Sequence, residues 1–361
     1  MRKVVFIDGV RTPFLKSGTD YMDLMSYQLG QFAIKGLLDK TGIDPNEIDR
    51  VILGNVISNV RTENVAREAA ITAGIPVKAP ANTVKQACIS ANQAICNAVD
   101  SIQLGRADVI VSGGTENTSD TPIGYTKEMR KKLFAAQKIS KPMDYAKFAM
   151  TLRPADFLPD RPSVTEFITG RTMGQDCEIL AQKFGVTREE QDELAAASHQ
   201  NAGKAQEQGL LDDVITVQLP PKFAPIAKDN GVRGDTTVDK ISKLKPAFDK
   251  YVGTITAANA SFLTDGATAV LLTSEEKAKE YILMNKPCLS ITEVLDLLEG
   301  DNTNLCEATY WKYNKTNKES LEAFKELVKN TFPFELSISV TLRENLLRAE
   351  VLDLNMVDLH V

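Results

Sequence analysis

The sequence predicts an α/β fold whose mostly parallel sheet is covered by helices. Along residues 3–125, short apolar runs suited to buried strands alternate with segments in which apolar residues recur at helical spacing. Glycine follows the periodic segments, at Gly42, Gly74 and Gly105, where helices commonly end. Helices of about 10–15 residues between strands are typical of parallel sheets.

The predicted elements follow one another in a regular order. The runs Val4–Ile7, Val51–Leu53 and Val109–Val111 predict strands, and residues 24–38, 64–73 and 89–102 predict the helices between them. Further along, residues 177–184 and 187–208 predict two helices, and Ala269–Leu272 predicts a final strand. The second of those helices opens with Thr187 and, three residues later, Glu190, which is the pattern of a capping box.

Changes of pattern divide the chain into four segments. Strand and helix alternate through residues 1–122, and the pattern changes in residues 123–246. Residues 247–275 return to the earlier pattern, and residues 276–361 change again. A chain of 361 residues is long enough for two or three domains.

Composition excludes several classes of function. The net charge of −6 gives no general attraction to nucleic acid, and no nucleic-acid partner is expected. The five cysteines are scattered without Cys-x-x-Cys spacing, which argues for a reducing compartment and against a disulfide scaffold or a zinc site. With only two histidines, a histidine-based metal cluster is not expected either.

The sequence predicts neither a membrane span nor a targeting segment. No apolar run reaches 18 residues, and the chain leads directly into a strand. Residues 127–153 are basic, with apolar side chains among the charges. Such a segment suits an anionic membrane surface or a solvated face packed on a neighbouring subunit, and the sequence leaves both open.

Cys88 is the candidate nucleophile. It lies where an extended run, Thr83–Val84, turns into a helix. Unpaired backbone N–H groups and the positive end of the helix dipole stabilise a thiolate at such a position. A thiolate is the attacking group in covalent catalysis, whereas a buried free cysteine acts as a small apolar residue. Position alone leaves both readings open.

Several segments resemble those of the thiolases, in the same order along the chain. They are Cys88–Ile95, Ser112–Ser119, Thr172–Gly174, Ser198–Ala202 and Thr256–Ser261. Within that family, residues 64–70, 163–167, 228–233 and 261–267 resemble the branch of long-chain 3-ketoacyl-CoA thiolases that form the beta subunit of a mitochondrial trifunctional enzyme. The resemblance covers about residues 1–278.

The resemblance implies a fold, a reaction and partners. The expected fold has two similar halves in five layers, with residues 123–246 as a loop domain inserted into the first half. Cys88 would attack a 3-ketoacyl-CoA and CoA would resolve the acyl-enzyme, with CoA as a substrate and no cofactor. Ser261 would contact the pantetheine arm and Arg233 the adenosine phosphates. A homodimer, a trifunctional alpha subunit as partner and a mitochondrial location are also implied.

Other polar residues of these segments have no expected acid–base role. His199 lies in the middle of a predicted helix and is expected to be structural or at the edge of the CoA channel. Asp120, Glu116 and Asn117 are expected to hold loops near a dimer interface.

The second thiolase half is expected to be absent or truncated. The family's Asn-Glu-Ala-Phe-like, Gly-His-Pro and Cys-x-Gly motifs do not occur in this sequence, and His360, Cys288 and Cys306 lie in other contexts. Two functions therefore stay open, a 3-ketoacyl-CoA thiolase of fatty-acid β-oxidation and an inactive thiolase-like subunit that binds CoA, a partner or a membrane. A condensing enzyme shares the fold and the cysteine but lacks the loop-domain motifs.

Overall fold

The computed structural model describes residues 2–160 and 165–280, together with the backbone of four short strands, Cys288–Ser290, Leu336–Ser339, Leu342–Arg343 and Leu346–Leu347. The chain forms two compact units. One consists of Met1–Asp120 with Gly174–Val361, and the other of Thr121–Met173. The segment 123–246, predicted as one insertion, is thus divided between the units. His360 and Cys306 lie outside the described residues.

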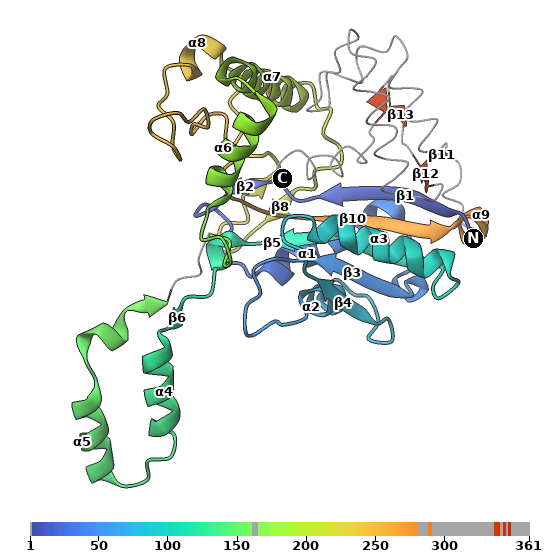
Figure 1. Cartoon of the computed structure of the whole chain (residues 1–361). Coiled ribbons are helices and arrows are strands. Elements are labelled where there is room, and N and C mark those ends of the chain that lie inside the picture. The colour runs from blue at the N-terminus through green and yellow to red at the C-terminus, as the bar shows by residue number, and fades with distance from the viewer. Residues whose placement is uncertain are drawn as a thin grey trace. The chain divides into compact units, whose positions relative to one another are not determined.

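A sheet flanked by helices forms the first unit, and the predicted alternation of strands and helices is confirmed (Figure 1). The helix predicted over residues 24–38 extends to Thr41, where Gly42 adopts the left-handed conformation that closes the helix. The elements in order are β1 (Val4–Arg11), β2 (Leu15–Lys16), α1 (Ser26–Thr41), β3 (Arg50–Gly54), α2 (Val65–Thr72), β4 (Ala81–Val84), α3 (Ser90–Gln103), β5 (Val109–Glu116) and β10 (Thr264–Ser274).

The strand order is β11-β12-β1-β10-β5-β3-β4, with β11 at Cys288–Ser290 and β12 at Leu336–Ser339. β5, β3 and β4 pair in parallel, as the alternating pattern predicts. β10 lies between β1 and β5 and is antiparallel to both. The sheet is therefore mixed, because β10 arrives from a distant part of the chain and not through a helical crossover from β5.

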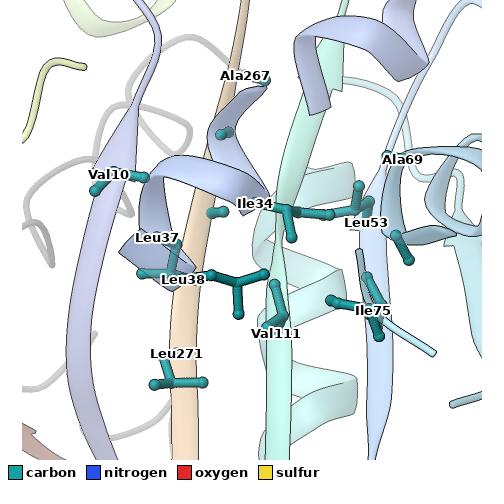
Figure 2. Close-up of a cluster of buried hydrophobic side chains, with 14 of the residues drawn as sticks. Val10, Ile34, Leu37, Leu38, Leu53, Ala69, Ile75, Val111, Ala267 and Leu271 are labelled. Carbon is teal, nitrogen blue, oxygen red and sulfur yellow. The ribbon is translucent and has the colours of Figure 1, made fainter. Parts of the chain in front are cut away.

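Helices cover both faces of the sheet. One face carries α1 and α2, and its core includes Ile34 and Leu37 of α1 against Val111 and Leu271 of the strands (Figure 2). The other face is covered by α3, whose Ala94, Ala98, Val99 and Ile102 are fully buried. Two apolar faces explain why the central strands are near-continuous apolar runs.

The rest of the first unit follows the second one in sequence. It holds α6 (Met173–Phe184), α7 (Arg188–Glu207), the strand pair β8 (Val217–Gln218) and β9 (Pro225–Ile226), α8 (Val238–Ile241) and α9 (Glu275–Glu280). The capping box at Thr187 and Glu190 is confirmed. Arg11 at the end of β1 joins this region to the sheet, because its guanidinium pairs with Asp229 at 2.7 Å and with Asp213 at 3.3 Å.

The second unit is a helical hairpin. The basic segment 127–153 forms α4 (Lys127–Ala136) and α5 (Pro142–Thr151), between β6 (Gly124–Tyr125) and β7 (Pro159–Asp160), which pair with each other. Lys132 bonds the carboxylate of Asp156 at 2.5 Å, which ties α4 to the turn Pro154–Phe157. Among the described residues, no helix is both long and apolar enough to cross a membrane.

Candidate active site

The topology brings Cys88 and Ser261 to the same edge of the sheet. Cys88 follows β4, and β4 runs parallel to β3 and β5. Ser261 precedes β10, which begins beside the last residue of β5, since Gly266 pairs with Glu116. Ligands of α/β folds bind at the carboxyl ends of parallel strands, so this edge is where a site is expected.

A tight turn presents Cys88 between β4 and α3. The preceding residue, Ala87, has a φ of 48°, a left-handed conformation that a residue with a side chain rarely adopts. The hydroxyl of Ser90 accepts the N–H of Gln86 at 2.8 Å and donates to the carbonyl of Ala87 at 2.6 Å. Ser90 thereby fixes both sides of the turn, and the strain at Ala87 is held by these bonds.

Two glycines let the start of α3 lie directly on the sheet. A Cβ at Gly54 would come within 2.3 Å of the backbone of Ser90 and Ala91, and one at Gly114 within 2.7 Å of the Ala91 side chain. Both glycines end or nearly end their strands, β3 and β5. The absence of side chains there sets how deeply the Cys88 turn lies on the carboxyl edge.

Cys88 is exposed and lies at the positive end of α3. The residue at the N-cap is Ile89, whose side chain offers no acceptor to the first N–H groups. Among the other described thiols, partial burial raises the pKa of Cys96, and partial desolvation with the nearby Glu178 raises the pKa of Cys177, which is exposed at the surface. Both of these thiols lie inside helices, whereas Cys88 precedes one.

Glu116 holds the loop that follows β3. Its carboxylate accepts the backbone N–H of Val56 at 2.7 Å and the side-chain amide of Asn55 at 3.2 Å. Burial raises the pKa of Glu116, and the bonded N–H groups partly oppose this. Lys85, three residues before Cys88, donates to the carbonyl of Val56 at 3.1 Å. Glu116 therefore supports the loop beside the Cys88 turn, in line with the predicted loop-holding role.

Asn117 and Asp120 also hold loops. The buried amide of Asn117 donates to the carbonyls of Tyr21 and Leu24 at 3.0 and 2.6 Å. The carboxylate of Asp120 accepts from Asn59 at 3.1 Å. The dimer interface that the sequence analysis places near these loops stays a prediction.

Ser261 ends a loop that α6 and α7 hold in place. We call residues 253–261 the Ser261 loop; Ser261 itself is exposed. The carboxylate of Glu178, only 4% exposed, accepts the N–H of Thr254 at 2.8 Å and that of Ile255 at 2.9 Å. A buried carboxylate with such partners is a rigid support for a loop.

Arg233 lies on a second loop, residues 229–236, which we call the Arg233 loop. The residue is exposed, and its guanidinium is near enough to Asp235 to lower the pKa of that carboxyl, after the larger effect of Lys240. The loop also bonds β2 and the residues before it, since Asn230 accepts the N–H of Lys16 at 2.7 Å and Asp229 that of Phe14 at 2.7 Å. An exposed cation on a held loop suits an anionic group such as a phosphate.

His199 contacts the Arg233 loop and not the Cys88 turn. Its Nδ1 accepts the backbone N–H of Arg233 at 3.3 Å. Burial, and after it the charges of Arg233 and Lys16, lower the pKa of His199, so the ring is neutral near pH 7. This geometry agrees with the predicted structural or peripheral role.

Within residues 2–160 and 165–280, no three side chains of the metal-binding types gather into a candidate metal site. A polar cavity of about 370 Å³ lies at the opposite edge of the sheet, with Arg2, Asp49, Asp108 and Lys277 in its lining. Its two cations already pair with carboxylates, Arg2 with Asp108, and Lys277 with Glu47 at 3.2 Å. The carboxyl edge is therefore the better candidate.

Sequence reasoning missed the residues that support the site. Gly54 and Gly114 could have been recognised from glycines at strand ends next to a helix start, although their contacts depend on packing. Asp192, buried within the polar helix α7, has one local signal, Arg188 four residues before it. Nothing in the sequence around Glu178 marks it as the support of a loop about 76 residues away.

Known proteins are similar to most of this chain. The family model described as the thiolase N-terminal domain matches residues 4–276. The trifunctional enzyme subunit beta of Bos taurus is 48% identical over 278 residues, which is 77% of this chain and 58% of that protein. A 3-ketoacyl-CoA thiolase of Pectobacterium atrosepticum is 41% identical and is covered over 64% of its length.

A solved structure supports the fold. The acetyl-CoA acetyltransferase of Bacillus anthracis is 34% identical with a TM-score of 0.65, over 78% of this chain and 67% of that one. The chain spans less than two thirds of the length of the curated relatives named above. On its sequence and its fold, the chain belongs to the thiolase family, and residues 4–276 are its thiolase N-terminal domain.

Proposed function

We propose that this chain acts in 3-ketoacyl-CoA thiolysis in fatty-acid β-oxidation, with Cys88 as the residue that accepts the acyl group. The single observation that carries the proposal is the Cys88 turn, an exposed thiol at the start of α3, placed by Ala87, Gly54 and Gly114. Relatives named 3-ketoacyl-CoA thiolase support the substrate class.

The proposed step is a carbon–carbon cleavage. The Cys88 thiolate attacks the 3-keto carbon of a 3-ketoacyl-CoA, and the bond between the second and third carbons breaks. The shortened acyl group stays on Cys88 as a thioester, and the departing enolate takes a proton to become acetyl-CoA. A second CoA thiol then takes the acyl group and restores the free cysteine.

The loops at the carboxyl edge have matching roles in the proposal. Ser261 contacts the pantetheine arm, and Arg233 lies near the adenosine phosphates of CoA. Both side chains are exposed on loops that hydrogen bonds from other elements hold in place, which suits residues that meet a ligand and not the core.

The test is acylation of Cys88 by acetoacetyl-CoA. The full chain is incubated with the substrate, and peptides are weighed by mass spectrometry. We expect one acetyl group on the Cys88 peptide, released again when CoA is added. Cys177→Ser is the matched control, because Cys177 is a second exposed thiol, and it should leave the acetylation unchanged. Acetyl groups on Cys177, or none on Cys88, would contradict the assignment.

A second candidate function is that of a CoA-binding subunit without turnover. The observation that favours it is in the sequence, which carries the nucleophile segment but not the Gly-His-Pro and Cys-x-Gly motifs. General acid–base help is worth about 100–10,000-fold in rate, so its loss would leave binding largely intact while turnover falls. Tight CoA binding together with no acetyl-Cys88 in the same experiment would favour this second function.

Partners and location are part of the same proposal. We expect an alpha subunit as partner and a mitochondrial location, because relatives carry the name of the mitochondrial trifunctional enzyme beta subunit. We also expect a homodimer through the thiolase N-terminal domain, which the resemblance to thiolases implies. Light scattering after size-exclusion chromatography tests the dimer, and a monomer at micromolar concentration would count against it.

The hairpin of α4 and α5 is proposed to contact an anionic membrane surface. Phe134, Met143 and Met150 are 67%, 70% and 79% exposed among basic side chains of the same two helices. Co-flotation with vesicles containing phosphatidylserine should exceed that with neutral vesicles. Lys131→Glu with Lys138→Glu should abolish the difference, and an unchanged flotation would instead favour a protein partner for this face.

A further inference from the structure

One side of α7 carries a line of residues that contact two loops. Arg188, Asp192, His199, Gly203 and Gln206 recur at intervals of three, four or seven, so they lie along one stripe of the helix. We call these five residues the α7 stripe. Toward the N-terminus the stripe meets the Ser261 loop, and toward the C-terminus it meets the Arg233 loop.

Asp192 connects the stripe to the Ser261 loop. Its carboxylate is 1% exposed and accepts the side-chain amide of Asn259 at 3.0 Å. Asn259 in turn accepts the N–H of Thr256 at 2.6 Å and donates to the carbonyl of Thr254 at 3.0 Å, which closes the loop on itself. The orientation of Asn259, and with it the loop, therefore depends on Asp192.

Arg188 completes this end of the stripe. Its Nε donates to Asp192 at 2.7 Å, and its Nη2 lies 3.0 and 3.2 Å from the carbonyls of Ile241 and Leu244. Those carbonyls belong to α8 and the turn that follows it. The carboxylate of this pair is buried while the Arg188 side chain is 18% exposed, so loss of the pair would leave the Asp192 charge unpaired in a buried place.

His199 and its neighbours connect the stripe to the Arg233 loop. His199 Nδ1 accepts the N–H of Arg233 at 3.3 Å, and Gln200 donates to the carbonyl of Thr236 at 2.7 Å. The backbone of α7 at Gly203 packs directly against that of the Arg233 loop, because a Cβ at Gly203 would come within 2.8 Å of the Cα of Gly234. Because Nδ1 accepts, the neutral ring carries its proton on Nε2.

We propose that the α7 stripe sets the spacing between the pantetheine and the phosphate subsites for CoA, with Asp192 and His199 as positioning residues. The inference rests on the proposed function, because it takes Ser261 and Arg233 as the residues that meet CoA. A stiff helix that holds both loops fixes the distance between them. The loops are then already ordered before the ligand binds, so binding loses no further free energy to ordering them.

The test compares two ligands on the full chain by isothermal titration calorimetry. CoA engages both loops, whereas pantetheine lacks the adenosine phosphates and engages the Ser261 loop alone. His199→Ala should weaken CoA binding about tenfold, the effect of one lost hydrogen bond, and leave pantetheine binding unchanged. His199→Asn, with an amide that can accept at the place of Nδ1, should restore CoA binding.

Asp192→Ala should weaken the binding of both CoA and pantetheine, because it releases the Ser261 loop. Glu193→Ala is the matched control on the exposed side of the same helix and should change neither. A second readout needs no ligand. Amide hydrogen exchange should become faster in the peptide that contains Arg233 in His199→Ala, and slow again in His199→Asn.

The outcomes separate the inference from the proposed function. If the unmodified chain binds neither ligand, the proposed function and the inference fall together. Should it bind CoA while His199→Ala binds equally well, with unchanged exchange at Arg233, the inference alone is overturned. If His199→Ala weakens the binding of CoA and of pantetheine equally, His199 has a general structural role, and this result also contradicts the inference.

Discussion

The Cys88 turn and the two loops held by α7 belong to the same compact unit but are built on different principles. The turn is placed mainly by backbone packing on Gly54 and Gly114, where the strand ends carry no side chains, with the Ser90 hydroxyl bonding both of its sides. The loops are held by hydrogen bonds to side chains, the Ser261 loop by the buried carboxylates of Glu178 on α6 and Asp192 on α7, and the Arg233 loop by His199 and Gln200 of α7. The turn should therefore be disrupted by an added side-chain atom at either glycine, whereas the loops should be released by the loss of a hydrogen-bond acceptor.

Gly54→Ala is the largest expected effect and tests the steric side of the comparison. The new Cβ would lie 2.3 Å from backbone atoms of Ser90 and Ala91, so α3 must move off the sheet. We expect a loss of at least about 1–3 kcal/mol in the free energy of unfolding, measured by urea denaturation. Gly124→Ala, with no atom within 4 Å of its Cβ, is the control and should be nearly neutral.

Glu178→Ala tests the polar side. It leaves the N–H groups of Thr254 and Ile255 without their acceptor in a buried place. The expected cost is about 1–3 kcal/mol in stability, with faster proteolysis within the Ser261 loop. Alkylation of Cys88 by iodoacetamide should stay at its normal rate; a changed rate would mean that the turn and the loop are not independent.

Ser90→Ala asks whether the turn also has a polar part. The variant loses the hydroxyl that bonds Gln86 and Ala87, at an expected cost of about 0.5–1.5 kcal/mol. Because the strain at Ala87 is then less well opposed, the rate of Cys88 alkylation should change more than the stability does. An unchanged rate would assign the position of Cys88 to packing alone.

The smallest expected effect is a pH dependence confined to the loops. The unfolded chain protonates His199 near pH 6.5, and the folded chain does so only at lower pH, because burial and the charges of Arg233 and Lys16 lower the pKa. In that window the unfolded state binds more protons, so stability rises with pH and is complete above about pH 6.5. His199→Asn should flatten this slope in denaturation curves between pH 5 and 7, while hydrogen-exchange protection in the Cys88 peptide, taken relative to the intrinsic exchange rate at each pH, shows no such dependence.

The two regions also differ in how far the sequence predicts them. Apolar periodicity predicts α1, α3 and their strands, because a buried face leaves a repeated pattern. The local capping signal at Thr187 correctly predicts where α7 begins. The α7 stripe leaves no such pattern. The sequence of a polar helix does not show whether its carboxylates face water or bind a loop. The left-handed Ala87 and the glycine contacts are likewise products of long-range packing.

The position of β10 has a consequence for how the chain reaches this structure. β10 separates β1 from β5, so residue 4 pairs with residue 274 and residue 266 with residue 116. During synthesis on a ribosome, the edges of β1 and β5 that pair with β10 have no neighbour until nearly all of the domain has been made. Pairings so distant in sequence are slow to form. The nascent chain therefore has a long interval in which exposed strand edges favour aggregation and chaperone binding.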